Sequence, residues 1–193
     1  SYPVSITVLF FPVTYIFADI LTEVYGYANA RNVLWTVMIC SIAAGLIYLG
    51  VALFPPSHIF DANESYKRVL GNVPRIIIGG WLAVFSGDIT NNFVLAKMKI
   101  LTKGKYLWTR TIGSTVVGEF VNTAVFYLIG LYGILPFNIL ITSILSGWTI
   151  KVLVEVVFTP VTYIVVAKLK KAENEDYYDD KTNFNPFLFK SPF

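Results

Sequence analysis

The chain has 193 residues, of which 55% are hydrophobic and only 14% are charged, whereas an ordinary soluble domain carries roughly 25% charged residues. The formal net charge of +3 is too small to indicate nucleic-acid binding. A single cysteine, Cys40, excludes an intrachain disulfide and a cysteine-based metal site. These values predict an all-α integral membrane protein and argue against a soluble enzyme.

Five hydrophobic stretches are long enough, or nearly so, to cross a bilayer, which requires about 20 apolar residues. They cover residues 4–25, 33–54, 74–96, 107–133 and 138–168. Because the last stretch is too long for one crossing, we expect a short or broken helix near 138–148, with the break around Ser146 to Trp148. The sequence therefore predicts a bundle of about five transmembrane helices.

The bundle and the segment after it define two regions of the chain. We expect a transmembrane helical domain over residues 1–171 and a polar, aromatic tail over residues 172–193. The tail is acidic at first, contains proline and has no helical period, so we expect it to be loosely ordered in the cytoplasm.

The loop charges predict how the chain is oriented, because cytoplasmic loops hold the excess of Lys and Arg. Basic residues gather between Lys97 and Arg110 and again between Lys168 and Lys171. Both groups indicate the cytoplasmic side of the inner membrane, which makes the C-terminus cytoplasmic. Alternation then places Ser1 outside, and since the chain starts there without Met, we expect one earlier helix and six spans in the full-length protein.

Ionisable residues inside membrane spans are costly, so each one is a functional hypothesis. Six occur here, and five of them are acids, so some must be protonated, hydrated or met by a cation. They are Asp19, Glu23, Asp88, Glu119, Lys151 and Glu155. Two structural alternatives stay open, in which Glu23 pairs with Arg31 and Lys151 pairs with Glu155 one helical turn away.

The third and fourth stretches repeat one polar design. In SGDITNN, Asp88 follows a glycine and precedes two asparagines, and in GEFVNT, Glu119 follows a glycine and precedes Asn122 and Thr123. Spacings of three and four residues place these side chains on one helix face. Polar stripes also hold helices together in membranes, but two carboxylate stripes exceed what that role needs. We therefore favour a substrate cavity.

The sequence contains no phosphate-binding loop, no intramembrane protease motif and no heme-ligand pair. We therefore expect no enzyme activity, no cofactor and no metal site.

The segment FPVTYIFADILTEVYGYANAR resembles the first-span motif of the queuosine-precursor transporter family, also called the vitamin uptake transporter family. GEFVNT and KVLVEVVFTPVTY are similar to later helices of that family, some members of which carry an acid where this chain has Asn122. The resemblance implies a further helix before the motif and import of 7-cyano-7-deazaguanine and 7-aminomethyl-7-deazaguanine. The first motif is matched by Phe11, Pro12, Asp19, Glu23, Gly26, Ala30 and Arg31.

A guanine-like base suits the polar residues found in the spans. One carboxylate can accept hydrogen bonds from the adjacent ring N–H and amine N–H groups of the base. The carbonyl of the base needs a donor such as Asn or Lys, and the flat face of the base stacks on aromatic rings. With the resemblance, this predicts substrate binding by Asp19, Asp88, Asn92, Glu119, Asn122, Lys151, Phe11, Tyr15 and Trp148. Coupling or gating is predicted for Glu23, Arg31 and Glu155.

The leading hypothesis is a stand-alone secondary or facilitated transporter. The alternative is a substrate-binding subunit resembling those of energy-coupling-factor vitamin uptake systems, which are also small six-helix proteins. We expect a small purine-like molecule and the lipid bilayer as partners, with no nucleic acid, and a homodimer stays open.

Overall fold

The computed structural model describes residues 7–54 and 73–188, without the side chains of residues 7–12, 48, 49, 51–53 and 73. Most of this part of the chain is helical and none of it forms a β-strand, which confirms the predicted all-α bundle. A π-helical turn, η1 (Tyr127–Leu131), directly follows the helix that ends at Phe126. The α-helices are α1 (Thr7–Tyr25), α2 (Tyr27–Leu53), α4 (Val73–Leu101), α5 (Leu107–Phe126) and α6 (Phe137–Glu173).

Three segments of the described residues are long and apolar enough to cross a membrane, namely Tyr27–Ile47, Leu107–Leu131 and Phe137–Glu173. This agrees with a multi-pass membrane bundle, while the count of five spans stays a prediction.

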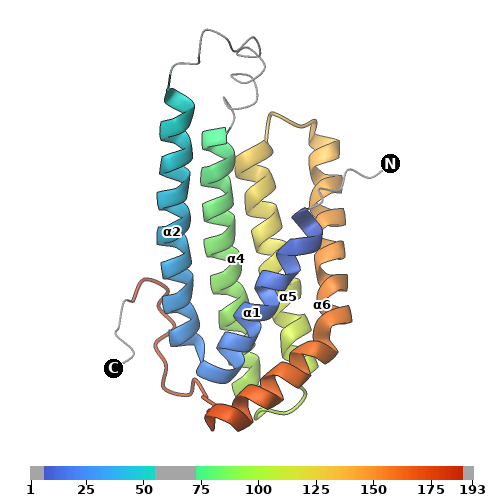
Figure 1. Cartoon of the computed structure of the whole chain (residues 1–193). Helices are drawn as coiled ribbons and strands as arrows, with labels where there is room; N and C mark the ends of the chain where they lie inside the picture. Colours follow the sequence, from blue (N-terminus) through green and yellow to red (C-terminus); the bar gives the residue numbers. More distant parts are fainter. Residues whose placement is uncertain (1–6, 55–72, 189–193) are drawn as a thin grey trace.

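The helices form one bundle with α1 laid across it. Figure 1 shows α2, α4, α5 and α6 side by side, with α1 running obliquely over them. Helix α1 contacts α6, α4 and α2. It ends where α2 begins, and the C-terminal part of α6 lies at the same end of the bundle (Figure 1). We call this end the tail end.

Helix α6 is continuous from Phe137 to Glu173, so the predicted break around Ser146 to Trp148 is wrong. Gly147 is buried within this helix, where an added Cβ would meet Thr123 of α5 at an ordinary contact distance of 3.8 Å, and the helix passes through this glycine without interruption. The excess length is accommodated by a bend near the C-terminal end of α6, visible in Figure 1. Pro160, the proline inside the helix, explains that bend because it removes a backbone hydrogen bond.

Two glycines bring α4 and α5 unusually close together. A Cβ added at Gly87 would lie 2.6 Å from the Cβ of Asn122, and one added at Gly118 would lie 2.6 Å from the Cβ of Asn91. No other residue fits at such distances, because every other residue has a Cβ. These glycines directly precede Asp88 and Glu119, so the close approach also brings the two acidic stripes together.

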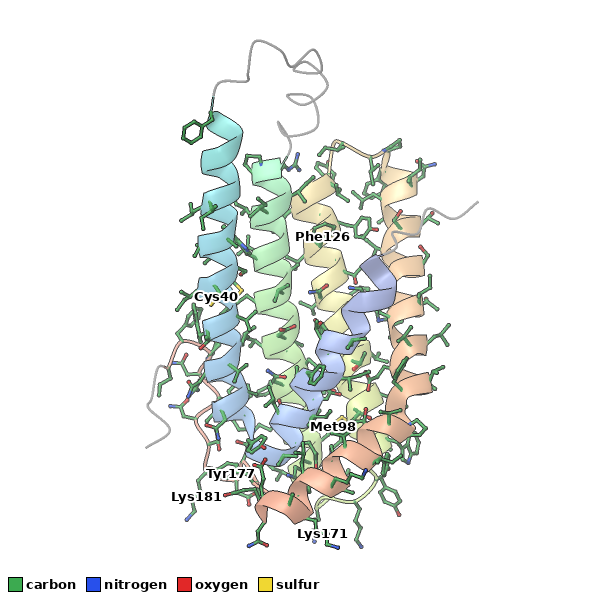
Figure 2. All side chains as sticks on the ribbon, viewed as in Figure 1. Cys40, Met98, Phe126, Lys171, Tyr177 and Lys181 are labelled. Carbon is green, nitrogen blue, oxygen red and sulfur yellow. The ribbon has the colours of Figure 1, made fainter. Side chains whose placement is uncertain are left out.

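The tail is held by defined contacts, so the prediction of a loosely ordered tail is wrong for residues 174–188. The main chain of Tyr177 donates to the carbonyl of Val24 at 3.1 Å, and the buried carboxylate of Asp179 accepts from the backbone N–H of Tyr27 at 3.0 Å. Figure 2 shows Tyr177 at the tail end, beside the start of α2. The composition of the tail predicted loose order, but its aromatic and acidic residues contact partners on the bundle.

Candidate functional site

The polar residues predicted from the sequence meet inside the bundle. We call this set the polar cluster, and it draws on four helices. Most of its members are buried. The cluster consists of Tyr15, Asp19 and Thr22 on α1, Asp88, Asn91 and Asn92 on α4, Glu119, Asn122 and Thr123 on α5, and Lys151 and Glu155 on α6.

Hydrogen bonds join α1 to α4 within the polar cluster. The Asn91 amide donates to Oδ1 of Asp19 at 2.6 Å, and the Thr22 hydroxyl donates to Oδ1 of Asn92 at 3.1 Å. One turn earlier, Tyr15 and Asp88 interact. Asn91 was not among the predicted binding residues, although it is the one that positions Asp19.

A buried lysine joins α6 to α5. Nζ of Lys151 donates to Oε2 of Glu119 at 2.8 Å, to Oδ1 of Asn122 at 3.1 Å and to Oγ1 of Thr123 at 3.2 Å. The Lys151 and Glu119 side chains are 9% and 0% exposed, so this ion pair is shielded from water. The predicted residues Glu119, Asn122 and Lys151 therefore form one unit.

Glu155 has a different environment from Glu119. It is fully buried, and neither of its carboxylate oxygens has a hydrogen-bond partner within residues 7–54 and 73–188. The alternative in which Lys151 satisfies Glu155 is therefore wrong. The acids near enough to act on Glu155 electrostatically include Asp19 and Glu119. A carboxyl placed in this way is stable only if it binds a proton or a cation, or meets water.

Several buried atoms of the polar cluster keep hydrogen-bonding capacity that no described residue uses. The acceptors are Oδ2 of Asp19, Oδ1 of Asn91 and Oε1 of Glu119, and the donor is the amide Nδ2 of Asn122. Buried polar atoms are normally paired, so each of these calls for a partner. The set can accept several N–H groups and donate to one carbonyl.

Of the predicted aromatic contacts, one lies outside the described side chains and another packs away from the polar cluster. Phe11 lies in α1, but its side chain is outside the described part of the structure. Trp148 lies on α6 and packs against α5, where its indole N–H donates to the carbonyl of Val116 at 2.9 Å and its ring meets Phe120 edge to face. Trp148 therefore packs α6 against α5. Tyr15 is the predicted aromatic residue that the structure places in the polar cluster.

A second group of charges surrounds Glu23 at the tail end. Arg110 donates to both oxygens of the fully buried Glu23 carboxylate, at 2.7 and 2.8 Å, and Lys170 donates to one of them at 2.5 Å. Lys99 donates to the main-chain carbonyl of Glu23 at 2.6 Å. We call Glu23, Lys99, Arg110 and Lys170 the Glu23 network, and it connects α1, α4, α5 and α6.

The alternative in which Glu23 pairs with Arg31 is therefore wrong. Arg31 is buried and donates instead to the main-chain carbonyls of Asn183 and Asn185, at 3.0 and 2.8 Å. Its guanidinium also lies over the ring of Tyr27. Arg31 binds the C-terminal tail, a partner that sequence patterns did not indicate.

Lys99 and Arg110 were missed as site residues, because loop charges were used only to predict orientation. Both are 1% exposed and lie inside helices. A periodic signal was present, since Arg110, Ser114, Gly118 and Asn122 recur every fourth residue on one face of α5. Extending the polar stripe of GEFVNT toward the N-terminus would have found Arg110.

Asp176 ties the tail to this network and should respond to pH. Burial alone would raise the pKa of its carboxyl, but hydrogen bonds from Lys170 and Lys99 outweigh burial and hold that pKa below its usual range. A lowered carboxyl pKa stabilises the fold above the ordinary pKa of about 3.9, and this contribution is lost as the pH falls through the lowered value.

The titration of Asp176 can be followed by carboxyl-selective NMR of the detergent-solubilised protein. We expect its midpoint below the ordinary value in the wild type. In Lys170→Met, which removes one hydrogen-bond donor, the midpoint should move upward. Equal midpoints in the two proteins would contradict the contacts described for Asp176.

Comparison with known proteins places this arrangement in a family. A family model described as "Putative vitamin uptake transporter" matches residues 5–165, which include all eleven members of the polar cluster. The chain belongs to the vitamin uptake transporter family. The family's description is that of a transporter and not of an enzyme, in agreement with the sequence-based prediction.

The chain is also similar to a curated protein, the "Probable queuosine precursor transporter" of Bacillus subtilis (strain 168). The two chains are 30% identical over 146 residues, which cover 75% of this chain and 64% of the relative. This chain therefore spans less than two thirds of the relative's length. No solved structure matches.

Proposed function

We propose that this chain carries queuosine precursors, 7-cyano-7-deazaguanine and 7-aminomethyl-7-deazaguanine, across the inner membrane as a stand-alone secondary or facilitated transporter. The family and the name of the Bacillus subtilis relative support the type of cargo. The observation that carries the proposal is the polar cluster, in which buried acceptors and a buried donor from three helices have unused hydrogen-bonding capacity.

In this proposal the atoms with unused hydrogen-bonding capacity form hydrogen bonds with the edge of the base. Oδ2 of Asp19 and Oε1 of Glu119 accept from the ring N–H and the exocyclic amine, while Nδ2 of Asn122 donates to the carbonyl. Lys151 holds Glu119 and Asn122 in place through its own hydrogen bonds. The ring of Tyr15, which is 2% exposed, offers a buried aromatic face.

Glu155 is the residue that we assign to coupling. It lies on the same helix as Lys151 and is buried next to other acids, and no described residue forms a hydrogen bond with its carboxylate. When a base occupies Asp19 and Glu119, the charge beside Glu155 changes, which alters how strongly it holds a proton. The proposal therefore makes Glu155 the group through which cargo and protons influence each other.

The tail end is the cytoplasmic end in this proposal. Exposed basic residues gather there, including Lys97, Lys168 and Lys171. Lys171 lies at the lower edge of Figure 2, on the same side of the bundle as Tyr177. An excess of Lys and Arg is the usual property of cytoplasmic loops.

Asp19→Asn and Glu119→Gln should each abolish uptake while leaving a folded, inserted protein, although Glu119→Gln also breaks the ion pair with Lys151 and should therefore unfold at a lower temperature. Both changes keep the shape of the side chain and remove the charge that strengthens a hydrogen bond to the base. Hydrogen bonds to charged groups contribute about 1.5–3 kcal/mol, so base binding should weaken about 10- to 100-fold. Uptake of radiolabelled base by cells, with thermal unfolding of the purified protein as a folding check, measures both effects.

Asp180→Asn is the matched control, because Asp180 is an exposed acid in the tail. It should transport like the wild type. Full uptake by both Asp19→Asn and Glu119→Gln would show that these acids only hold helices together.

A host that lacks every energy-coupling module separates the two transport modes. The stand-alone mode predicts that such a host, expressing this chain alone, accumulates labelled base. Uptake that appears only after the module subunits are added would establish the alternative, a substrate-binding subunit of an energy-coupling-factor system.

A further inference from the structure

Residues 174–188 form a strap that runs from the end of α6 to the sides of α2 and α4. Figure 1 shows this segment leaving the red end of α6 and passing beside the lower part of α2. Its hydrogen-bond partners lie on α1, α2 and α4. Neither the polar cluster nor the proposed cargo explains why a tail should be held by so many groups.

The first half of the strap fastens the junction between α1 and α2. Tyr177 donates from its main chain to Val24, near the end of α1, and the Asp179 carboxylate accepts from the N–H of Tyr27, the first residue of α2. An acid at this position satisfies a free N–H and interacts favourably with the positive end of the helix dipole. The junction itself is Gly26, whose φ of +82° favours glycine, and a Cβ there would overlap the Tyr177 ring.

The second half of the strap fastens α2 to α4. Trp35 on α2 donates from its indole nitrogen to the carbonyl of Pro186 at 2.8 Å, next to the carbonyls that Arg31 holds. The ring of Phe184 meets Phe93 on α4 edge to face, with ring centroids 5.2 Å apart, and Nζ of Lys97 lies 4.1 Å from the centre of the Phe184 ring. The strap therefore spans three helices of the bundle.

The strap and the Glu23 network share two lysines. Lys99 donates to the carbonyl of Glu23, to Oδ1 of Asp176 and to the carbonyl of Tyr177, at 2.6, 2.6 and 2.7 Å. Lys170 forms ion pairs with both Glu23 and Asp176. Releasing the strap therefore leaves both lysines with fewer partners and loosens the network around Glu23.

The Glu23 network and the strap both lie beside the polar cluster, toward the tail end. Asp19 and Glu23 are one turn apart on the same face of α1, and both are fully buried. Along α1 from Asp19 toward the tail end, the Glu23 network comes first and the contact of the strap with Val24 comes next. The network and the strap are held by ion pairs and hydrogen bonds, some of which involve the partly exposed carboxylate of Asp176. Such polar contacts exchange readily with contacts to water.

We propose that the strap is the gate at the tail end, and that it must leave Lys99 and the α1–α2 junction each time the bundle opens on that side. This inference rests on the proposed transport function. Gly26 is the single residue between α1 and α2, and the strap is hydrogen-bonded to Val24 and Tyr27 on either side of it, so a movement of α1 against α2 has to break or stretch these hydrogen bonds.

Reversible cross-linking tests whether the strap must move. Cys40 is the single cysteine of the chain, so Cys40→Ala gives a cysteine-free parent. In that parent, Phe93→Cys and Phe184→Cys are joined by a short bis-methanethiosulfonate reagent. We expect uptake of labelled base to fall to background on cross-linking and to return after reduction, while each single-cysteine variant treated with the reagent keeps its uptake. Unchanged uptake by fully cross-linked protein would overturn the proposal.

A second measurement does not depend on the cargo. Thr22→Cys in the cysteine-free parent places a thiol at a fully buried position of the polar cluster. Adding Asp179→Asn, or ending the chain after Glu173, should increase its labelling by a polar maleimide in detergent at least tenfold. Asp180→Asn should leave the rate unchanged. Equal rates with and without Asp179→Asn would overturn the gate, even where the shortened chain does not fold.

The two measurements separate failure of the gate from failure of the proposed function. If the parent takes up no deazaguanine, the proposed function fails, and the labelling rates still decide whether the strap closes the bundle. If uptake is normal but neither cross-linking nor Asp179→Asn has an effect, the gate fails and the proposed function stands.

Discussion

Lys151→Met should both destabilise the protein and abolish uptake. Lys151 neutralises Glu119 inside the bundle and donates to Asn122 and Thr123, so its loss leaves a buried carboxylate without its partner. Breaking a buried ion pair in this way costs about 3–5 kcal/mol. Thermal unfolding in detergent and uptake of labelled base in cells measure the two effects.

The double variant Lys151→Met/Glu119→Gln separates stability from function. Removing both charges avoids the unpaired carboxylate, so most of the lost stability should return. Uptake should stay at background, because the proposed site loses a carboxylate that reads the base. Lys168→Met, an exposed lysine on the same helix, is the control and should match the wild type in both assays. Normal uptake by the double variant would show that the pair serves only to hold α5 and α6 together.

Gly87→Ala should have the second large effect, because the new methyl group has no space. Its Cβ would lie 2.6 Å from both the Cβ of Asn122 and the hydroxyl oxygen of Tyr15. Overpacking costs about 1–3 kcal/mol, which exceeds the gain of up to about 1 kcal/mol in helix propensity when alanine replaces glycine. Separating α4 from α5 also displaces Asn122 and Tyr15, so we expect weak uptake from a less stable protein.

Gly80→Ala is the matched control on the same helix. A Cβ at Gly80 meets nothing within 4 Å, so only the propensity gain applies. This variant should be as stable as the wild type or slightly more stable, with normal uptake. Similar behaviour of the two alanine variants in thermal unfolding and uptake would contradict the close packing described for Gly87.

Part of the site was predictable from local spacing. Asp19, Glu119 and Lys151 were found because charges in apolar stretches are rare and costly, and the structure brings them to one cluster. The choice between Asn91 and Asn92 was not predictable, since both follow Asp88 within one turn. Only the crossing of α1 over α4 decides that Asn91 meets Asp19 while Asn92 meets Thr22.

The features that the sequence did not predict depend on contacts between segments far apart in the chain. Composition predicted a loosely ordered tail, although Asp179 lies beside Tyr27 and Arg31 donates to the carbonyls of Asn183 and Asn185. The break around Gly147 was predicted from the length of the stretch, whereas α6 runs through Gly147 without interruption and contains Pro160 nearer its C-terminal end. Hydrophobic periodicity describes helices one at a time and does not reveal which distant segment covers them.

Equilibrium binding by the purified protein tests the central claim most directly. Thermal-shift measurements against a panel of 7-deazaguanines, purines and vitamins report binding, because a ligand that binds only the folded state raises its apparent stability. We predict stabilisation by 7-cyano-7-deazaguanine and 7-aminomethyl-7-deazaguanine, and little or none of it in Asp19→Asn. Stabilisation by a vitamin but by no deazaguanine, or an unchanged shift in Asp19→Asn, would contradict the polar cluster as the site for these bases.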